Sequence, residues 1–198
     1  MRQTGTGQID GGEYYNAIHF DEHVELATAP EFIGNTIAYS GGHGNAINSQ
    51  NADGAQIIAN HAEHFNHNGF DTKHSASVAI RGNVAHDGIE TNGIYQEYCA
   101  GGLIENNTVY NLSGSVAGRG SGIQIDAGSS GTTILHNSIS NVLTGIYLIP
   151  PATVRYNTVS NAGHAALEAN AGGSIDHNSW GVAPILLVNG RQVADHGN

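Results

Sequence analysis

The feature that most constrains the fold of this chain is an asparagine that returns at nearly regular intervals. Similar residues surround each copy, as in residues 33–37 (IGNTI), 80–84 (IRGNV) and 154–159 (VRYNTV). A repeat of this length predicts a solenoid, in which each coil contacts only its neighbours. A polar residue at one register among apolar ones also predicts a stack of side-chain amides, each donating to and accepting from the next coil. The copies are Asn35, Asn60, Asn83, Asn107, Asn137, Asn157 and Asn178, with gaps of 25, 23, 24, 30, 20 and 21 residues.

A second strand is expected after each asparagine strand. Its copies open on a small residue, usually glycine, and then alternate; they are 45–49, 69–73, 93–97, 122–126, 145–149 and 165–169. Because side chains alternate along a strand, two inward columns are predicted. They are Phe70, Ile94, Ile123, Ile146 and Ala166, and Thr72, Gln96, Ile125, Leu148 and Glu168. Glu168 does not suit an inward column, which indicates a looser winding there or a register that slips by one residue.

The rest of the chain is assigned by elimination. No segment shows convincing helical periodicity, and residues 61–67, with histidines three apart, are interpreted as a turn. Residues 1–31 are expected to form a partial N-terminal coil or cap, residues 32–180 the repeats, and residues 181–198 a C-terminal cap or truncated end. Within the last segment, residues 185–188 followed by Asn189-Gly190 predict a strand and a tight turn. A cap would cover the open edge of the stack.

The composition excludes several classes of protein. Charged residues make up 12% of the chain, against about 25% in a typical globular domain. The net charge of −11 with only six Lys and Arg argues against a nucleic-acid-binding surface. No apolar run reaches the roughly 18 residues of a membrane span. The single cysteine, Cys99, excludes an intrachain disulfide framework.

Residues 104–111 (IENNTVYN) and 145–148 (GIYL) resemble the right-handed parallel β-helix repeats of the pectate-lyase-like superfamily. The resemblance covers roughly residues 32 to 180. It implies an all-β fold, a right-handed parallel β-helix of about seven coils, with three sheets around one core and ligands on the outer face of one sheet. The superfamily includes polysaccharide lyases, glycoside hydrolases, uronan epimerases, phage tailspikes and non-catalytic surface proteins, so the fold alone does not decide the activity. An extracellular or cell-surface location is expected, although the polar N-terminus shows no signal peptide.

The outward positions of the second strand predict a functional groove. Neighbouring coils lie about 4.8 Å apart, so side chains in one column are in contact. The preceding turns bring His64, His67, His86 and Asp87, and a longer turn at residues 113–120 brings Arg119. Aromatic rings, amides and carboxylates suit the rings and hydroxyl groups of a polysaccharide; the competing interpretation is an ordinary solvated strand surface. The predicted outward columns are Ile47, Asp71, Tyr95, Gln124, Tyr147 and Leu167, and Ser49, Lys73, Glu97, Asp126, Ile149 and Ala169.

Residues 69–75 (GFDTKHS) resemble the Gly-Phe-Asp-x-Lys stretch of some β-helix polysaccharide lyases. That resemblance implies that Lys73 abstracts the proton next to a uronate carboxylate, which requires a lowered lysine pKa. Arg119 would clamp a carboxylate or phosphate. Calcium would neutralise the substrate carboxylate, with Asp71, Glu97 and Asp126 as oxygen ligands. Two departures stand against this: the tight Asp cluster of calcium-dependent lyases is absent, and Glu97 would raise the pKa of Lys73.

Other chemistries remain open from the sequence. Relatives on this fold use Tyr and His as acid and base, for which Tyr95, His64, His67 and His86 are candidates. The spacing of His61, His64 and His67 is compatible with zinc. Paired carboxylates could hydrolyse a glycoside, with Glu97 joined by Asp126 or Asp71, and an epimerase is a further possibility. The alternative of a different class is a non-catalytic β-helix that binds carbohydrate or serves as a structural surface or tail element.

Overall fold

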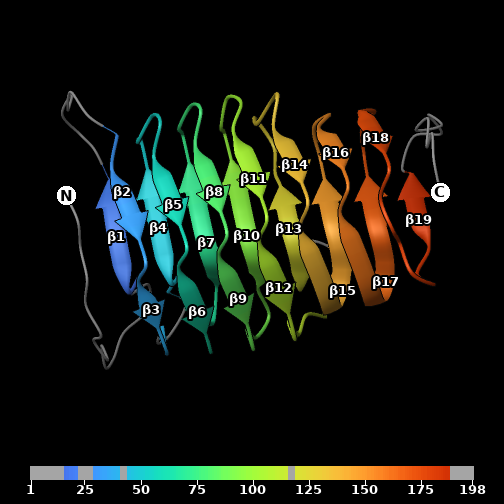
Figure 1. Cartoon of the computed structure of the whole chain (residues 1–198), viewed down its shortest axis with the longest axis horizontal. Coiled ribbons are helices and arrows are strands. Elements are labelled where there is room, and N and C mark those ends of the chain that lie inside the picture. The colour runs from blue at the N-terminus through green and yellow to red at the C-terminus, as the bar shows by residue number, and fades with distance from the viewer. Residues whose placement is uncertain (1–15, 22–28, 41–43, 116–118, 188–198) are drawn as a thin grey trace.

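The computed structural model describes residues 16–21, 29–40, 44–115 and 119–187, and these form a parallel β-helix. Consecutive coils stack along the long axis of the molecule, from the N-terminal to the C-terminal end (Figure 1). Every strand pair in the described part of the chain is parallel, and the predicted all-β fold is confirmed. No helix in this part is long and apolar enough to cross a membrane.

Each full coil presents three faces. Within the described residues the first face is a sheet of seven strands, so this part of the chain completes six turns between its first and last strand, close to the seven coils predicted. Its strands are β2 (Glu31–Ile33), β5 (Gln56–Ile58), β8 (Ala79–Arg81), β11 (Leu103–Glu105), β14 (Thr133–Leu135), β16 (Thr153–Arg155) and β18 (Ser174–Asp176).

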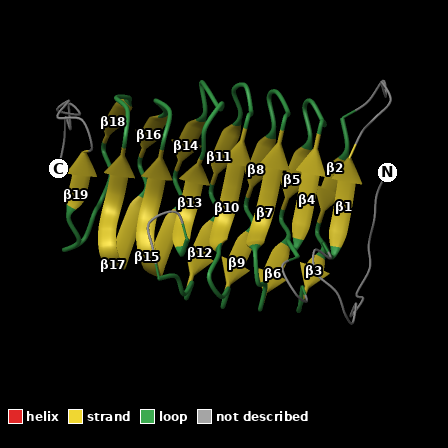
Figure 2. Cartoon of the chain, turned by 180° about the vertical axis from the view of Figure 1, so that it is seen from behind, coloured by secondary structure: helices red, strands yellow, loops and turns green. Residues whose placement is uncertain are grey.

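The second and third faces are joined into one sheet by two long strands, β15 (Ser138–Leu148) and β17 (Thr158–Ala169). The second face begins with β3 (Thr36–Ile37), β6 (His61–Glu63), β9 (Val84–His86) and β12 (Thr108–Tyr110). The third contains β1 (Ile18–Asp21), β4 (Ile47–Gln50), β7 (Asn68–Lys73), β10 (Asn92–Glu97), β13 (Ser121–Ile125) and β19 (Ile185–Leu187). Figure 2 shows β3, β6, β9 and β12 next to one another, below the strands of the third face.

The core is a set of apolar columns, one inward residue per strand and coil. Their burial supplies the main driving force for folding. The glycine that opens the second-strand repeat has a steric reason: a Cβ on Gly93 would lie 2.4 Å from Val109 and 2.8 Å from the carbonyl oxygen of Gly122. The columns include Ile57, Ile80, Ile104, Ile134 and Val154 on the first face, and Phe70, Ile94, Ile123 and Ile146 on the third, all at most 1% exposed.

The asparagine ladder is buried and continuous, as predicted. Asn107 is typical: its Nδ2 donates to Asn137 Oδ1 and to the carbonyl of Ile80, and its backbone N–H donates to the same Oδ1, all at 2.9 Å. The residue before each asparagine adopts a positive φ, for example Gly34 at 66° and Asn106 at 56°. For a non-glycine residue this left-handed conformation costs about 1–2 kcal/mol, and the ladder holds it at the corner between the first two faces.

The register of the last coils differs from the sequence prediction. Ile146 pairs with Leu167, not with Ala166, and Tyr147 pairs with Glu168, after an irregularity between Val142 and Thr144. The extra residue moves Leu167 into the core and Glu168 outward, which explains why a charge fell in a predicted inward column.

Two outward assignments in an earlier coil are wrong for the same reason. Ile47 pairs with Phe70 and Ser49 with Thr72, so both are inward and fully buried. Asn48, the partner of Asp71, takes the outward position between them. A one-residue shift exchanges the two faces of a strand because side chains alternate.

The predicted turn at residues 61–67 is also partly wrong, since β6 begins at His61 and buries Ala62. At the ends, β1 pairs with β4 as a first partial coil, and β19 pairs in parallel with β17. The strand predicted near residue 185 is therefore present, and it extends the sheet. The predicted tight turn at Asn189-Gly190 lies outside the described residues, as do 1–15 and the rest of 188–198.

Candidate functional site

A groove of about 870 Å³ lies on the third face, where β7, β10 and β13 are neighbours. The predicted site and this groove overlap closely, because the outward columns and the long turn both contribute to its walls. Its lining consists of Asn66, His67, Asn68, Lys73, Ile89, Glu90, Thr91, Asn92, Tyr95, Glu97, Arg119, Gln124 and Asp126. The parallel registers of β7, β10 and β13 place these side chains together.

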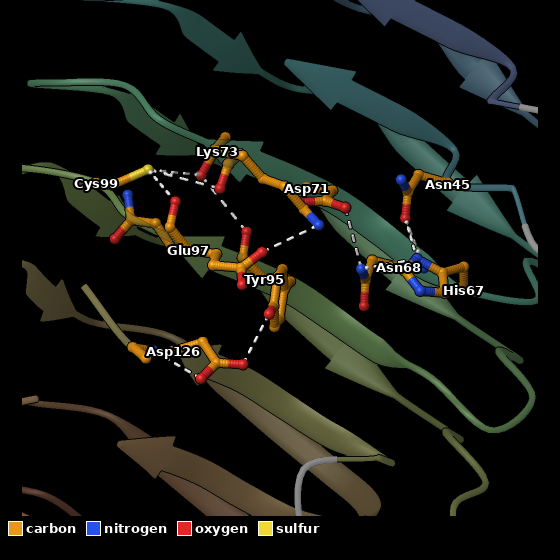
Figure 3. Close-up of polar contacts among 12 residues, drawn as sticks. Asn45, His67, Asn68, Asp71, Lys73, Tyr95, Glu97, Cys99 and Asp126 are labelled. Carbon is orange, nitrogen blue, oxygen red and sulfur yellow. Dashed lines mark hydrogen bonds and ion pairs between the residues drawn. The ribbon is translucent and has the colours of Figure 1, made fainter. Parts of the chain in front are cut away.

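Lys73 lines the groove and lies among acidic groups; Figure 3 shows it beside Asp71 and Glu97. Its Nζ lies 3.1 Å from Glu97 Oε2 and 5.4 Å from the centroid of the Tyr95 ring. Burial acts to lower the pKa of Lys73, but the negative charges of Asp71 and Glu97 outweigh it and raise the pKa above its ordinary value. Lys73 is therefore an ammonium ion at neutral pH, suited to binding an anion.

Asp71 is fully buried beneath these side chains. Burial raises its pKa to about 6, against the opposing effect of Lys73. Asn68 Nδ2 donates to Asp71 Oδ2 at 3.2 Å, while Oδ1 has no hydrogen-bond partner among the described residues. A buried carboxyl group with a strongly perturbed pKa beside a groove is a typical feature of a functional site.

Tyr95 and Gln124 both bind Asp126, on the next coil from Tyr95. The Tyr95 hydroxyl donates to Asp126 Oδ2 at 2.7 Å, and Gln124 Nε2 donates to the same oxygen at 3.1 Å. Burial, together with the Asp126 carboxylate, raises the pKa of Tyr95 well above its ordinary value, so the phenol keeps its proton. Gln124 Oε1 is buried and has no partner in the described part of the chain.

Arg119 differs from the other arginines that the structure describes. Arg81 and Arg155 lie on the first face, where they pair with Glu105 at 3.7 Å and Asp176 at 3.0 Å. Arg119 lines the groove and has no carboxylate partner within the described residues. Two of the six Lys and Arg of an acidic chain thus line one groove.

A second amide ladder, which the sequence reasoning missed, borders the groove. Asn68 N–H donates to Asn45 Oδ1 at 3.0 Å, and Asn92 Nδ2 donates to Asn68 Oδ1 at 3.2 Å. The backbone N–H of Ser121 continues it by donating to Asn92 Oδ1 at 3.1 Å. The signal was present in the sequence, since asparagine precedes the small residue at positions 16, 45, 68 and 92.

Four of the predicted site residues do not line the groove, and the first is Asp71, which is fully buried. His64 stacks on Tyr39 with ring centroids 4.9 Å apart, and His86 faces β6 on the second face. Tyr147 is outward, but its hydroxyl accepts a 3.2 Å hydrogen bond from Asn170. His67 does line the groove, bound to Asn45 Oδ1 at 2.8 Å.

The three predicted calcium ligands do not fit a preformed ion site. Glu97 is engaged by Lys73, Asp126 by Tyr95, and Asp71 is buried on Asn68. Within the described residues there is one group in which at least three possible metal-ligand atoms lie within 4.8 Å of one another. That group contains none of these three carboxylates.

Comparison with known proteins supports the fold. A family described as "Right handed beta helix region" matches residues 16–180, which is most of the chain. No curated protein matches the sequence. The chain therefore belongs to the right-handed β-helix family, and the predicted handedness is confirmed.

Proposed function

Because a right-handed β-helix fixes no activity by itself, we propose from the groove that this protein binds an acidic polysaccharide along β7, β10 and β13. The observation that carries the proposal is that two cationic side chains, Lys73 and Arg119, line the same groove in a chain with net charge −11. Arg119 has no carboxylate partner within the described residues, and a cation left unpaired in such an acidic protein favours an anionic group on the ligand.

The other side chains of the groove suit a saccharide. The face of Tyr95 can contact a sugar ring. The carboxylates of Glu97 and Asp126, which line the groove, can accept from hydroxyl groups. The Arg119 guanidinium can bind a uronate carboxylate through two parallel hydrogen bonds.

Eliminative cleavage is the second candidate, favoured by the presence of Lys73, Tyr95 and Arg119 in the same groove. In that reaction Lys73 would take the proton next to the uronate carboxylate, and the leaving oxygen would receive a proton from the protonated Tyr95. The raised pKa of Lys73 opposes the first step, because the amine must lose its proton before it can act as a base. Binding is therefore the primary proposal and cleavage the secondary one.

The test is binding of pectate, alginate and glycosaminoglycans by calorimetry, with a neutral polysaccharide as the comparison and with either calcium or a chelator present. We expect an anionic polymer to bind, and Arg119→Ala to weaken it at least tenfold. Arg155→Ala, an exposed arginine on the first face, is the matched control and should bind like the wild type. Absence of binding to every anionic polymer, or equal affinity of Arg119→Ala and wild type, would exclude the proposal.

The cleavage candidate has its own readout. Elimination creates an unsaturated product that absorbs in the ultraviolet, so absorbance during incubation detects it directly. Activity that is lost in Lys73→Ala supports the lyase role. Binding without any rise in absorbance leaves a carbohydrate-binding protein, and wild-type rates from Lys73→Ala exclude Lys73 as the base.

A further inference from the structure

A cluster of metal-ligating side chains lies on the second face, away from the groove. His61 and Glu63 lie on β6, and His86 ends the neighbouring strand β9 (Figure 2). Ala62 between them is buried, so His61 and Glu63 both point outward. Glu63 pairs in register with His86, which brings the three side chains together.

The ligand atoms of this cluster converge. His61 Nε2 lies 2.7 Å from His86 Nε2, and His86 Nε2 lies 3.7 Å from Glu63 Oε2. All three ligand atoms lie within 4.8 Å of one another, and the described residues contain no other such group. Two imidazole nitrogens and one carboxylate oxygen form a set of ligands typical of zinc and related transition metals.

Asp87 and Tyr110 fix the orientation of the His86 side chain. Its Nδ1 lies 2.7 Å from Asp87 Oδ2 and donates to that carboxylate, which leaves the Nε2 lone pair directed at His61. The Tyr110 ring stacks on the His86 ring at 4.6 Å and 7°. A carboxylate that accepts from the second nitrogen of a histidine is the usual outer partner of a metal ligand.

Asp87 is itself held by an exposed amide ladder. Asn111 Nδ2 donates to Asp87 Oδ1 at 3.2 Å, Asn141 Nδ2 donates to Asn111 at 3.0 Å, and Asn161 Nδ2 donates to Asn141 at 3.1 Å. The ladder therefore ends on a residue that only accepts. Asp87 Oδ1 accepts from Asn111 and Asp87 Oδ2 accepts from His86, so both oxygens of this carboxylate hold neighbouring side chains in place.

Two ring nitrogens 2.7 Å apart cannot both direct lone pairs at each other, because the lone pairs would repel. Either a hydrogen atom or a metal ion must lie between them. One solution is a proton on His61 Nε2 that forms a hydrogen bond to His86. The other is a metal ion: with Zn–N bonds of about 2.0–2.1 Å in a tetrahedron, the nitrogens would lie roughly 3.3 Å apart. Side-chain rotations that separate the rings by about half an ångström would therefore admit the ion.

We propose that His61, Glu63 and His86 bind one Zn²⁺ ion, with Asp87 as the positioning residue of His86. The fourth position would be open to water, because the side chain of Glu63 is 32% exposed. Three protein ligands and one water form the arrangement typical of a zinc ion that can act on a substrate. The turn from Asp87 to Thr91 connects this site to the groove, which Ile89, Glu90 and Thr91 help to line.

The test is titration of chelator-treated protein with ZnCl₂ by calorimetry, together with the visible absorption of the Co²⁺ form. We expect one ion per chain, an affinity reduced at least 100-fold in His61→Ala and His86→Ala, and one reduced about 10- to 100-fold in Asp87→Asn. The matched control is His64→Asn, which removes a neighbouring histidine outside the cluster and suits the left-handed φ of 54°. It should bind zinc like the wild type.

Circular dichroism of each variant checks that a loss of affinity does not come from unfolding. If a histidine variant unfolds, Glu63→Gln preserves both rings and should still weaken zinc binding. Absence of stoichiometric binding by the wild type would overturn the proposal and leave a hydrogen-bonded histidine pair. Unchanged affinity in a folded double variant, His61→Ala with His86→Ala, would also overturn it.

Discussion

The buried asparagine ladder and the outward row of the groove are built on the same coils but differ in nearly every respect. The ladder repeats one residue, and the amide of Asn107 binds both neighbouring coils and a carbonyl. The groove row changes from Asp71 to Tyr95 to Gln124, and two of these side chains have a buried oxygen without a partner in the described structure. The inner rungs of the uniform ladder therefore satisfy one another's polar groups, whereas the varied row leaves two buried oxygens without partners.

The two rows also differ in their effect on stability. The ladder joins neutral groups, and its rungs from Asn60 to Asn157 bind amides on both neighbouring coils, which offsets the cost of burying them. The groove buries a carboxyl group whose pKa rises to about 6, which shows that its ionised form is unfavourable there. Such a cost is expected at a site shaped by binding or catalysis, since natural proteins depart from local rules at functional positions.

The largest effect is expected from breaking the ladder. Asn107→Leu removes the acceptor of the Asn83 N–H group and one of the two acceptors of Asn83 Nδ2, and both donors stay buried. At about 1–3 kcal/mol for each unpaired donor hydrogen, the free energy of unfolding should fall by about 3–4 kcal/mol, as measured by urea denaturation. A loss below about 1 kcal/mol would show that the ladder is not a major source of stability.

Asp71→Asn should have the opposite sign. Between about pH 4 and pH 6 the folded state keeps the Asp71 proton that the unfolded state has already released, so stability falls as pH rises through this window. Asparagine does not titrate, so the variant should be more stable than the wild type by about 3 kcal/mol at pH 7. The gain should disappear below about pH 4.

Urea denaturation at both pH values measures this difference. A destabilised Asp71→Asn protein at pH 7 would mean that the interaction with Lys73 outweighs burial. The contrast between the two rows would then be lost.

The smallest effect is expected from the exposed amide ladder. Asn141→Leu is the same substitution as in the buried ladder, but the side chain of Asn141 is exposed and its φ is 52°. The loss should be about 1–2 kcal/mol, mainly because leucine adopts the left-handed conformation less easily than asparagine. Thermal unfolding of the two variants side by side measures the difference, and equal losses would show that burial of the ladder is unimportant.

The sequence was sufficient to predict the fold because its signals repeat. Seven asparagines at one register and the small residue that opens each second-strand repeat determine the coil length. The close contacts of Gly93 show why that residue must be small. The position of Lys73 opposite Glu97 followed directly from the register. Errors arose where the repeat changes, as at Leu167 and Glu168, where an extra residue shifts the strand.

The remaining features depend on distances that a repeat pattern does not contain. Outward positions are normally solvated, so nothing in the strand pattern indicates that Asp71 is fully buried. The contact between His61 and His86 requires residue 61 to be in a strand, whereas histidines three apart favoured a turn. Of those three histidines, only His61 belongs to the group whose ligand atoms converge. The second amide ladder was the one feature that closer reading of Asn45, Asn68 and Asn92 could have found.

The most direct test of the groove is a titration of ¹⁵N-labelled protein with an acidic oligosaccharide that binds, followed by amide NMR shifts. We expect the changes in amide chemical shift to be concentrated at Lys73, Tyr95 and Gln124, with little change at the ladder residues Asn83 and Asn137. Shifts confined to the first face, or no shifts at saturating oligosaccharide, would contradict it.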